Sequence, residues 1–409
     1  MKSGVYLAVI FSLLLSRAFA ADMPPGIPDP DKAIQDPSYN DPVFFWRLTS
    51  QPENPYEPEP YFYWPPGVVH GAPQPFFPAR AQGDHEGTAG EISDATLKAM
   101  ATWAEEHGSN ALIVIHKGRL LTENYWNGMT ADEIVNGRAI TRSVTPMLLG
   151  FAVADGKLKL DDPIGRYITE WKTDLRGKVT VRQLAQNVSG LEVAPQLGLR
   201  PVYGNKDLCL VYCGDVVRAA LSYDYAIEPG TKFETAQENT QLLALVIERA
   251  TGTSVQELLS ERVWKKIGAA DAAFQLDRPG GVARVMCCMR ATPRDWARLG
   301  VLVMQNGVWE GQQILPKGWV DIMATPSKQY RNFGLGLWLG SPLDKVRSQR
   351  IPQSEPFKAD DTWIMEGGGF RIVHMVPSQD LVIYRHGVSV PDWDASYLVN
   401  TAMGDLLPD

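Results

Sequence analysis

The stretch "AITRSVTPMLLGFAVADG", from Ala139 to Gly156, decides the fold. Its second half is almost entirely apolar, and a glycine just past an apolar run is typical of a helix C-terminus. The pattern therefore predicts a buried helix from Ala139 to Asp155. Pro146 has no N–H to donate to the Arg142 carbonyl, so a kink is expected inside this helix.

Strand and helix patterns continue on both sides of this helix. A helix is predicted from Ser93 or Asp94, either of which can act as its N-cap, to Gly108. Short strand patterns then occur in "ALIVIHKGRLLTENYW" and, near the C-terminus, in "GLGLWL", "FRIVHMVP" and "DLVIYRH". Helical patterns fill about 165–290. This order predicts an α+β fold, within the wider α/β group, over 91–405: an antiparallel sheet flanked by helices, with an inserted all-helical subdomain.

The N-terminus has the pattern of a secretory signal peptide. Lys2 precedes the apolar run "GVYLAVIFSLLLS", and small residues follow at Ala18 and Ala20. We expect cleavage before Ala21, so that residues 1–20 form the signal peptide and the rest of the chain is periplasmic or secreted. An uncleaved membrane anchor is the alternative for this segment. In either case we expect only residues 1–20 to contact the membrane.

Residues 21–90 are predicted to form an extended arm. Half of the 30 prolines of the chain fall in this segment, together with the aromatic clusters "FFW", "YFYW" and "FF". Proline excludes a helix here, and the aromatic content is too high for a free linker. We expect the arm to lie across the folded domain, with a partner-binding tail as the alternative.

Charge and cysteine content exclude some functions and suggest one modification. The net charge is −8 and no basic patch is interleaved with aromatics, so nucleic-acid binding is not expected. The 6 histidines form no pair at ligand spacing, and neither a metal nor a cofactor is predicted. An oxidising compartment allows disulfides among the four cysteines, with buried free thiols as the alternative. They are Cys209, Cys213, Cys287 and Cys288.

Several phrases resemble the serine β-lactamase and penicillin-binding-protein superfamily, and within it the class C-like hydrolases that include esterases and 6-aminohexanoate-dimer hydrolases. They are "LLGFAVADGKLKLDDPIGRYI", "VSGL", "EPGTKFETAQENTQLLALVIERATG", "ATPRDWARLGVLVMQNGVWEGQQILPKGW" and "GLGLWLG". The resemblance implies the fold predicted above. It also implies three catalytic elements: Ser-x-x-Lys at the start of the buried helix, a tyrosine that relays protons, and Lys-Thr-Gly on a strand beside the site.

The first element has lost its chemistry in this chain. Counting back from Gly150 by the family's spacing places the nucleophile at Ala139 and the lysine at Arg142. Alanine has no attacking atom, and arginine stays protonated, so it cannot act as a base. Ser143 is the alternative nucleophile, but the residue at the lysine spacing from it is Pro146.

The other two elements have also changed. "FETAQENTQLL" places Thr235 at the tyrosine position and Gln237 two residues later, and Asn239 is predicted to cap the next helix. The Lys-Thr-Gly position falls on Met365-Glu366-Gly367, where only Gly367 matches. The motif positions are thus Ala139, Arg142, Thr235 and Gly367, with no conventional catalytic residue among them.

These losses predict a pseudoenzyme with a disarmed pocket that binds a small molecule, a peptide-like ligand or a protein. The predicted ligand-binding residues are Arg142, Gln237, Glu366, Gly367 and Gly368. As a buried cation Arg142 needs an anionic partner or ligand, and Glu366, Glu234 and Glu238 are candidate partners. Two other hypotheses remain: an active ester or amide hydrolase that uses Ser143, and a structural envelope protein that acts through its arm. The oligomeric state is not predicted.

Overall fold

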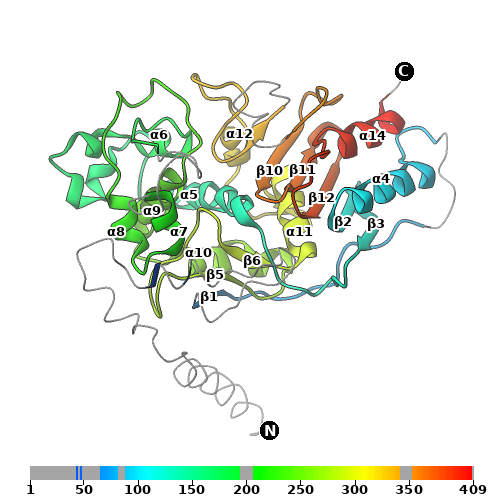
Figure 1. The fold of residues 1–409 in the computed structure, drawn as a ribbon, viewed down its shortest axis with the longest axis horizontal. Coiled ribbons are helices and arrows are strands. Elements are labelled where there is room, and N and C mark those ends of the chain that lie inside the picture. The colour runs from blue at the N-terminus through cyan, green and yellow to red at the C-terminus, as the bar shows by residue number, and fades with distance from the viewer. Residues whose placement is uncertain are drawn as a thin grey trace, which may run out of the picture.

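A computed structural model describes residues 43, 44, 47, 65–81, 88–193, 206–340 and 352–407. The predicted signal peptide and much of the predicted arm lie outside these residues. A six-stranded antiparallel sheet carries helices on both faces, and a helical lobe lies beside it (Figure 1). The predicted fold class, an antiparallel sheet flanked by helices with a helical insertion, is confirmed.

The main sheet has the strand order β3-β2-β12-β11-β10-β9. Its strands are β2 (Ser109–His116), β3 (Arg119–Tyr125), β9 (Trp338–Leu339), β10 (Trp363–Gly367), β11 (Arg371–Val376) and β12 (Leu381–Gly387). The turn between β2 and β3 is at Lys117 and Gly118, which both have positive φ, as a two-residue hairpin of this kind requires. The N-terminal and C-terminal parts of the chain therefore pair directly, through β2 and β12.

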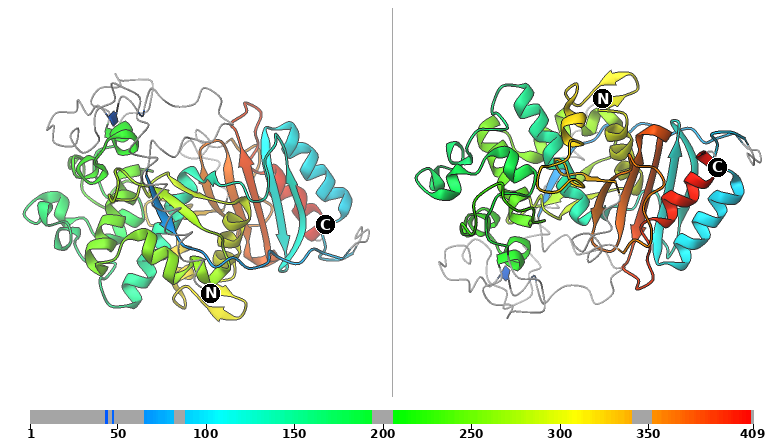
Figure 2. Two further views of the ribbon diagram at one scale, coloured as in Figure 1. Left: turned by 90° about the horizontal axis from the view of Figure 1, so that it is seen from below. Right: turned by 90° about the horizontal axis from the view of Figure 1, so that it is seen from above.

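The alternation of side chains in β2 creates two cores. Leu112 and Val114 face the helices α4 (Asp94–Glu106) and α14 (Tyr397–Leu406), which cover one face of the sheet (Figure 2). Ile113 and Ile115 face the other core, which contains α11 (Pro293–Met304) and the helical lobe. Every one of these four strand side chains is at most 1% exposed, so both faces of the sheet are buried.

The helical lobe is built around two long buried helices. Its helices are α5 (Val144–Ala154), α6 (Val181–Ala185), α7 (Lys206–Tyr212), α8 (Val216–Leu221), α9 (Gln237–Thr251) and α10 (Val255–Arg262). Helix α9 is buried continuously from Glu238 to Ile247 and ends at Gly252 in the left-handed conformation. Because nine residues of α5 and ten of α9 are buried, these two helices form the centre of the lobe rather than its rim.

The start of α5 differs from the helix predicted over Ala139 to Asp155. A 3₁₀ helix, η2, spans Arg138–Ser143, and the α-helix begins only at Val144. Pro146 therefore lies in the first turn of α5, where a missing N–H costs little. The helix type thus changes from 3₁₀ to α two residues before this proline. The C-terminal end agrees with the pattern, because Gly156 has φ 67° and follows the last turn.

The described part of the predicted arm lies along the domain. Strand β1 (Pro66–Val69) pairs with β5 (Ala272–Gln275), which continues through β6 (Met289–Ala291) to β4 (Val135–Asn136) in a second sheet. Beyond β1, the carbonyl of Gln74 accepts a 2.7 Å hydrogen bond from the Arg298 guanidinium. These backbone contacts hold residues 65–81 in an extended path over both lobes.

Three shorter elements complete the described fold. They are β7 (Val308–Trp309), β8 (Gln312–Gln313) and α12 (Trp319–Met323). Trp319 donates a 2.9 Å hydrogen bond from its indole N–H to the Pro146 carbonyl, so α12 supports the start of α5.

Two pairs of cysteines lie within disulfide distance, Cys209 with Cys213 and Cys287 with Cys288. Each pair joins neighbouring residues of one segment, so neither link ties distant parts of the fold together. Among the described residues no helix has the length and apolar character needed to cross a membrane.

Candidate functional site

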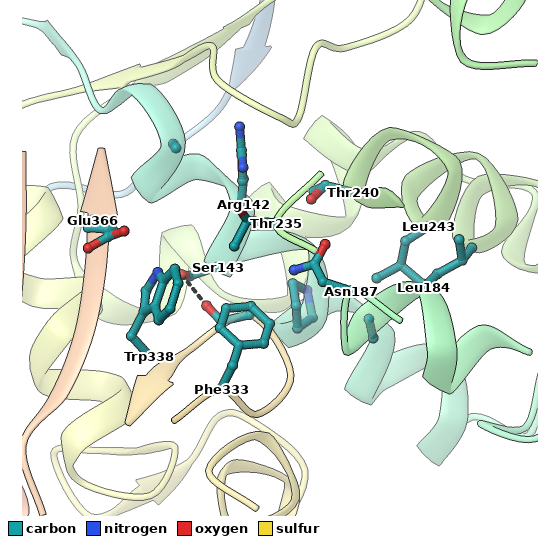
Figure 3. A pocket seen from close by; sticks show the side chains of 14 residues that line it. Arg142, Ser143, Leu184, Asn187, Thr235, Thr240, Leu243, Phe333, Trp338 and Glu366 are labelled. Carbon is teal, nitrogen blue, oxygen red and sulfur yellow. Dashed lines mark hydrogen bonds between the residues drawn. The ribbon is translucent and has the colours of Figure 1, made fainter. Parts of the chain in front are cut away.

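A cavity lies at the N-terminal end of α5, between the main sheet and the helical lobe (Figure 3). Its lining residues are Ala139, Arg142, Ser143, Pro146, Leu184, Ala185, Asn187, Thr235, Thr240, Leu243, Phe333, Gly336, Trp338 and Glu366. The structure therefore brings Ala139, Arg142, Ser143, Thr235 and Glu366 together, although they come from three separate parts of the chain. Gln237, Gly367 and Gly368 are not among the lining residues.

The backbone around Ala139 is held by close contacts. Arg138 has φ 52°, which is unfavourable for a residue with a side chain, and its N–H donates a 2.8 Å hydrogen bond to the Asn136 side chain. Strand β10 approaches this segment so closely that a Cβ at Gly367 would lie 2.4 Å from the Gly137 carbonyl oxygen and 3.0 Å from the Ala139 nitrogen. Only glycine at position 367 allows β10 to lie against the start of η2.

The strand period explains why Glu366 lines the cavity and Gly367 does not. Successive residues of β10 point to opposite sides, so the carboxylate of Glu366 faces the cavity while Gly367 faces the η2 backbone. Gly368 is exposed, and a Cβ there would meet nothing within 4 Å. Of the three ligand-binding residues predicted in this segment, only Glu366 lines the cavity.

Ser143 lines the cavity, but its hydroxyl is already used. It donates a 2.6 Å hydrogen bond to the Gly336 carbonyl, and the side chain is only 3% exposed. Gly336 has φ 71°, and a Cβ there would lie 2.6 Å from Pro146 Cγ. Ser143 therefore joins the start of α5 to the loop that contains Gly336, which is a structural contact.

Arg142 is half-buried on another wall of the cavity. Its Nε donates a 2.9 Å hydrogen bond to the Met286 carbonyl. Among the three candidate carboxylates, Glu234 forms an ion pair with Lys232 at 2.6 Å, and no described contact links it to Arg142. Glu238 is close enough for the Arg142 charge to lower its pKa, but burial dominates and raises that pKa to about 8.

The loop before α9 contributes Thr235 to the cavity, and the start of the helix corrects the role predicted for Asn239. Helix α9 begins at Gln237, and its N-cap, Ala236, makes no side-chain capping bond. Asn239 therefore lies inside the first turn and donates a 3.3 Å hydrogen bond to the Asn187 side chain. Thr235 and Asn187 both line the cavity, and Figure 3 shows them on the side facing Arg142.

Sequence reasoning missed the apolar wall of the cavity. Phe333, Gly336 and Trp338 come from the loop before β9 and from β9 itself, while Leu184 and Leu243 come from α6 and α9. Two phrases used for the family resemblance, "VSGL" and "GLGLWLG", lie next to or within these segments. Aromatic residues bracketing a glycine pair are a signal that could have indicated a cavity wall.

The cavity is small, with a volume of about 50 Å³ available to water. That is room for a few water molecules or a small chemical group. No cluster of three or more potential metal ligands occurs among the described residues.

A family model named Beta-lactamase matches residues 97–386 of the chain. The chain belongs to the Beta-lactamase family. A curated relative from Paenarthrobacter ureafaciens, "6-aminohexanoate-dimer hydrolase", is 26% identical over 240 residues, which are 55% of this chain and 59% of the relative. "Protein flp" of Staphylococcus aureus strain MW2 is 22% identical over 40% of this chain and 34% of its own length. The alignments therefore span less than two thirds of these relatives.

Solved structures show the Beta-lactamase family fold as well. A structure titled "Putative 6-aminohexanoate-dimer hydrolase from Bacillus anthracis" has a TM-score of 0.67 and 20% identity, covering 84% of this chain and 90% of that one. A family VIII carboxylesterase has a TM-score of 0.58 and 16% identity, over 76% and 96% of the two chains. At this level of identity the likeness concerns the fold alone.

Proposed function

We propose that this Beta-lactamase family member binds a small ligand in its cavity without hydrolysing it. The observation that carries the proposal is the position of Ala139 in the cavity lining, with Arg142 and Thr235 around it. The family resemblance assigns the nucleophile, the lysine and the tyrosine to these three positions. Loss of the nucleophile alone removes many orders of magnitude in rate from such a catalytic unit.

The remaining groups support binding rather than catalysis. Arginine is charged at any working pH, so Arg142 can attract an anion or donate hydrogen bonds but cannot accept a proton. The Thr235 hydroxyl has too high a pKa for a general base. Among the described residues that line the cavity there is no Lys, Tyr, His or Cys.

The alternative function is a hydrolase that uses Ser143 as its nucleophile. The contacts of Ser143 do not favour this alternative. Attack on a carbonyl carbon needs a base that removes the hydroxyl proton. The Ser143 proton is directed instead at the Gly336 carbonyl, which is far too weak a base to accept it. The structural role of Ser143 accounts for its presence without catalysis.

The proposal includes export to the periplasm or the exterior. It is supported by the signal-peptide pattern and by two cysteine pairs within disulfide distance. The structural role for the N-terminal arm remains a separate prediction, because much of the arm lies outside the described residues. Deleting residues 22–85 and measuring ligand binding separates the two hypotheses.

Turnover and covalent labelling test the proposed function together. Purified protein is incubated with esters, amides and D-amino-acid peptides, then with a fluorophosphonate or a penicillin, and the intact mass is measured. We expect neither turnover nor an adduct. A thermal-shift screen with peptidoglycan fragments and short amides should yield at least one stabilising ligand. A stable adduct on Ser143 would contradict the proposal and support the active-hydrolase alternative.

A further inference from the structure

One wall of the cavity combines a carboxylate with two aromatic rings. Glu366 projects from β10, Trp338 from β9, and Phe333 from the loop before β9 (Figure 3). We propose that this wall binds the ammonium group of a small amine, or of a larger ligand that ends in one. The inference rests on the proposed function, namely that the cavity binds a ligand, and it specifies the chemistry of that ligand.

The aromatic rings are fixed by a packed cluster. Phe333 and Trp338 meet edge-to-face with ring centroids 5.2 Å apart, and Phe233 packs against Phe333 at 5.2 Å. Tyr330 stacks on Phe233 at 4.5 Å, and the side chains of Phe333 and Trp338 are only 5% and 6% exposed. Rings held in this way need little further ordering when a ligand binds, which favours affinity.

The loop between the two rings is also held from the other side. Gly336 lies between Phe333 and Trp338, and its carbonyl accepts the Ser143 hydrogen bond. Its positive φ and its close approach to Pro146 leave little freedom for the loop. Ser143 and Pro146 therefore act as positioning residues for the aromatic wall.

The charge and the rings of this wall favour the same kind of group. A half-buried carboxylate attracts a cation more strongly than an exposed one, because less water screens the charge. The faces of aromatic rings attract ammonium groups through the ring quadrupole. A neutral amide benefits from neither effect, and a carboxylate ligand is repelled by Glu366. Arg142 lies on a different wall and disfavours a ligand with a second positive charge (Figure 3).

The size of the cavity limits what can enter. Its volume of about 50 Å³ is a third of the roughly 150 Å³ of an engineered cavity that holds benzene. An ammonium group with a few carbon atoms fits this space. For a longer ligand, the ammonium end enters the cavity and the remainder stays outside.

Three probes of nearly equal size test the assignment: propylammonium, propionate and propionamide. Ligand-detected NMR measures their affinities for the full chain, for Glu366→Gln and for Glu261→Gln. Glu261 is the matched control, because it is a glutamate that pairs with Lys265 at an exposed site. We expect propylammonium to bind most tightly, to lose about 10- to 100-fold in Glu366→Gln, and to be unaffected in Glu261→Gln. Phe333→Leu should weaken binding several-fold.

Melting temperatures establish that each variant is folded. If Phe333→Leu does not fold, the comparison of Glu366→Gln with the original chain decides the result. Absence of propylammonium binding, or equal affinity for the original chain and Glu366→Gln, overturns the ammonium assignment. Tighter binding of propionate or propionamide overturns it too but leaves the proposed function intact. Turnover or covalent labelling in the earlier assay is a different result, which refutes the proposed function itself.

Discussion

Replacing Glu238 by glutamine should change the pH dependence of stability. Glu238 is the second residue of α9 and is only 1% exposed. Burial raises its pKa from 4.5 to about 8, the charge of Asp207 raises it further, and Arg142 opposes the shift. Because the folded protein binds this proton more tightly than the unfolded chain, the stabilisation is complete below pH 4.5. It is lost as the pH rises to about 8.

The size of the effect follows from the two pKa values. A shift from 4.5 to about 8 corresponds to about 5 kcal/mol at a pH above both values. About 2–3 kcal/mol of the free energy of unfolding should be lost between pH 5 and pH 7, and about 4 kcal/mol between pH 5 and pH 9. Glutamine has the same shape but does not titrate, so Glu238→Gln removes this contribution.

Urea unfolding at pH 5, 7 and 9 measures the effect as the difference in free energy between Glu238→Gln and the original chain. The difference should shift in favour of Glu238→Gln by about 4 kcal/mol from pH 5 to pH 9. Glu261→Gln, at an exposed ion pair, should change by no more than about 0.5 kcal/mol. A pH-independent difference for Glu238→Gln would refute the reasoning, because Glu238 would then be ionised in the folded protein at every pH tested.

Three further predictions concern packing around the cavity and the arm. Gly367→Ala should destabilise the protein by about 1–3 kcal/mol in urea unfolding, because the new methyl group meets the Gly137 carbonyl; a change below about 0.5 kcal/mol would contradict this close approach. Ser143→Ala should cost about 1–2 kcal/mol by leaving the Gly336 carbonyl without its donor, and loss of a hydrolytic activity in this variant would instead identify a nucleophile. Residues 65–81 should resist limited proteolysis of the native protein, and rapid cleavage within them would show that their contacts do not persist in solution.

Much of the fold could be predicted from local patterns. The strands of the main sheet have short apolar runs bounded by turn residues, and α11 has Thr292 as its N-cap and a proline in its first turn. The start of α5 could not be predicted as well, because the choice between 3₁₀ and α geometry at Arg138–Ser143 depends on contacts with β10. Those contacts join residues more than two hundred positions apart.

The candidate site also has a part that the sequence predicts and a part that depends on tertiary packing. Ala139, Arg142, Thr235 and Glu366 were placed by the spacing of family phrases, and they meet at one cavity. The burial of Glu238 and the aromatic wall were not foreseen, because both depend on how α9 and the loop before β9 pack against other elements. Asn239 was predicted as a cap because its residue type suits that position, whereas the helix begins two residues earlier.

Restoring the missing chemistry in steps tests the central claim most directly. Each variant is incubated with an activated ester or a β-lactam, and the label is located by mass spectrometry. Ala139→Ser alone should remain unlabelled, because Arg142 cannot take the hydroxyl proton. Adding Arg142→Lys should permit slow labelling at position 139, and adding Thr235→Tyr should increase its rate by about 10²–10⁴-fold. Labelling of the unmodified chain at Ser143, or a folded triple variant without any label at position 139, would contradict the account.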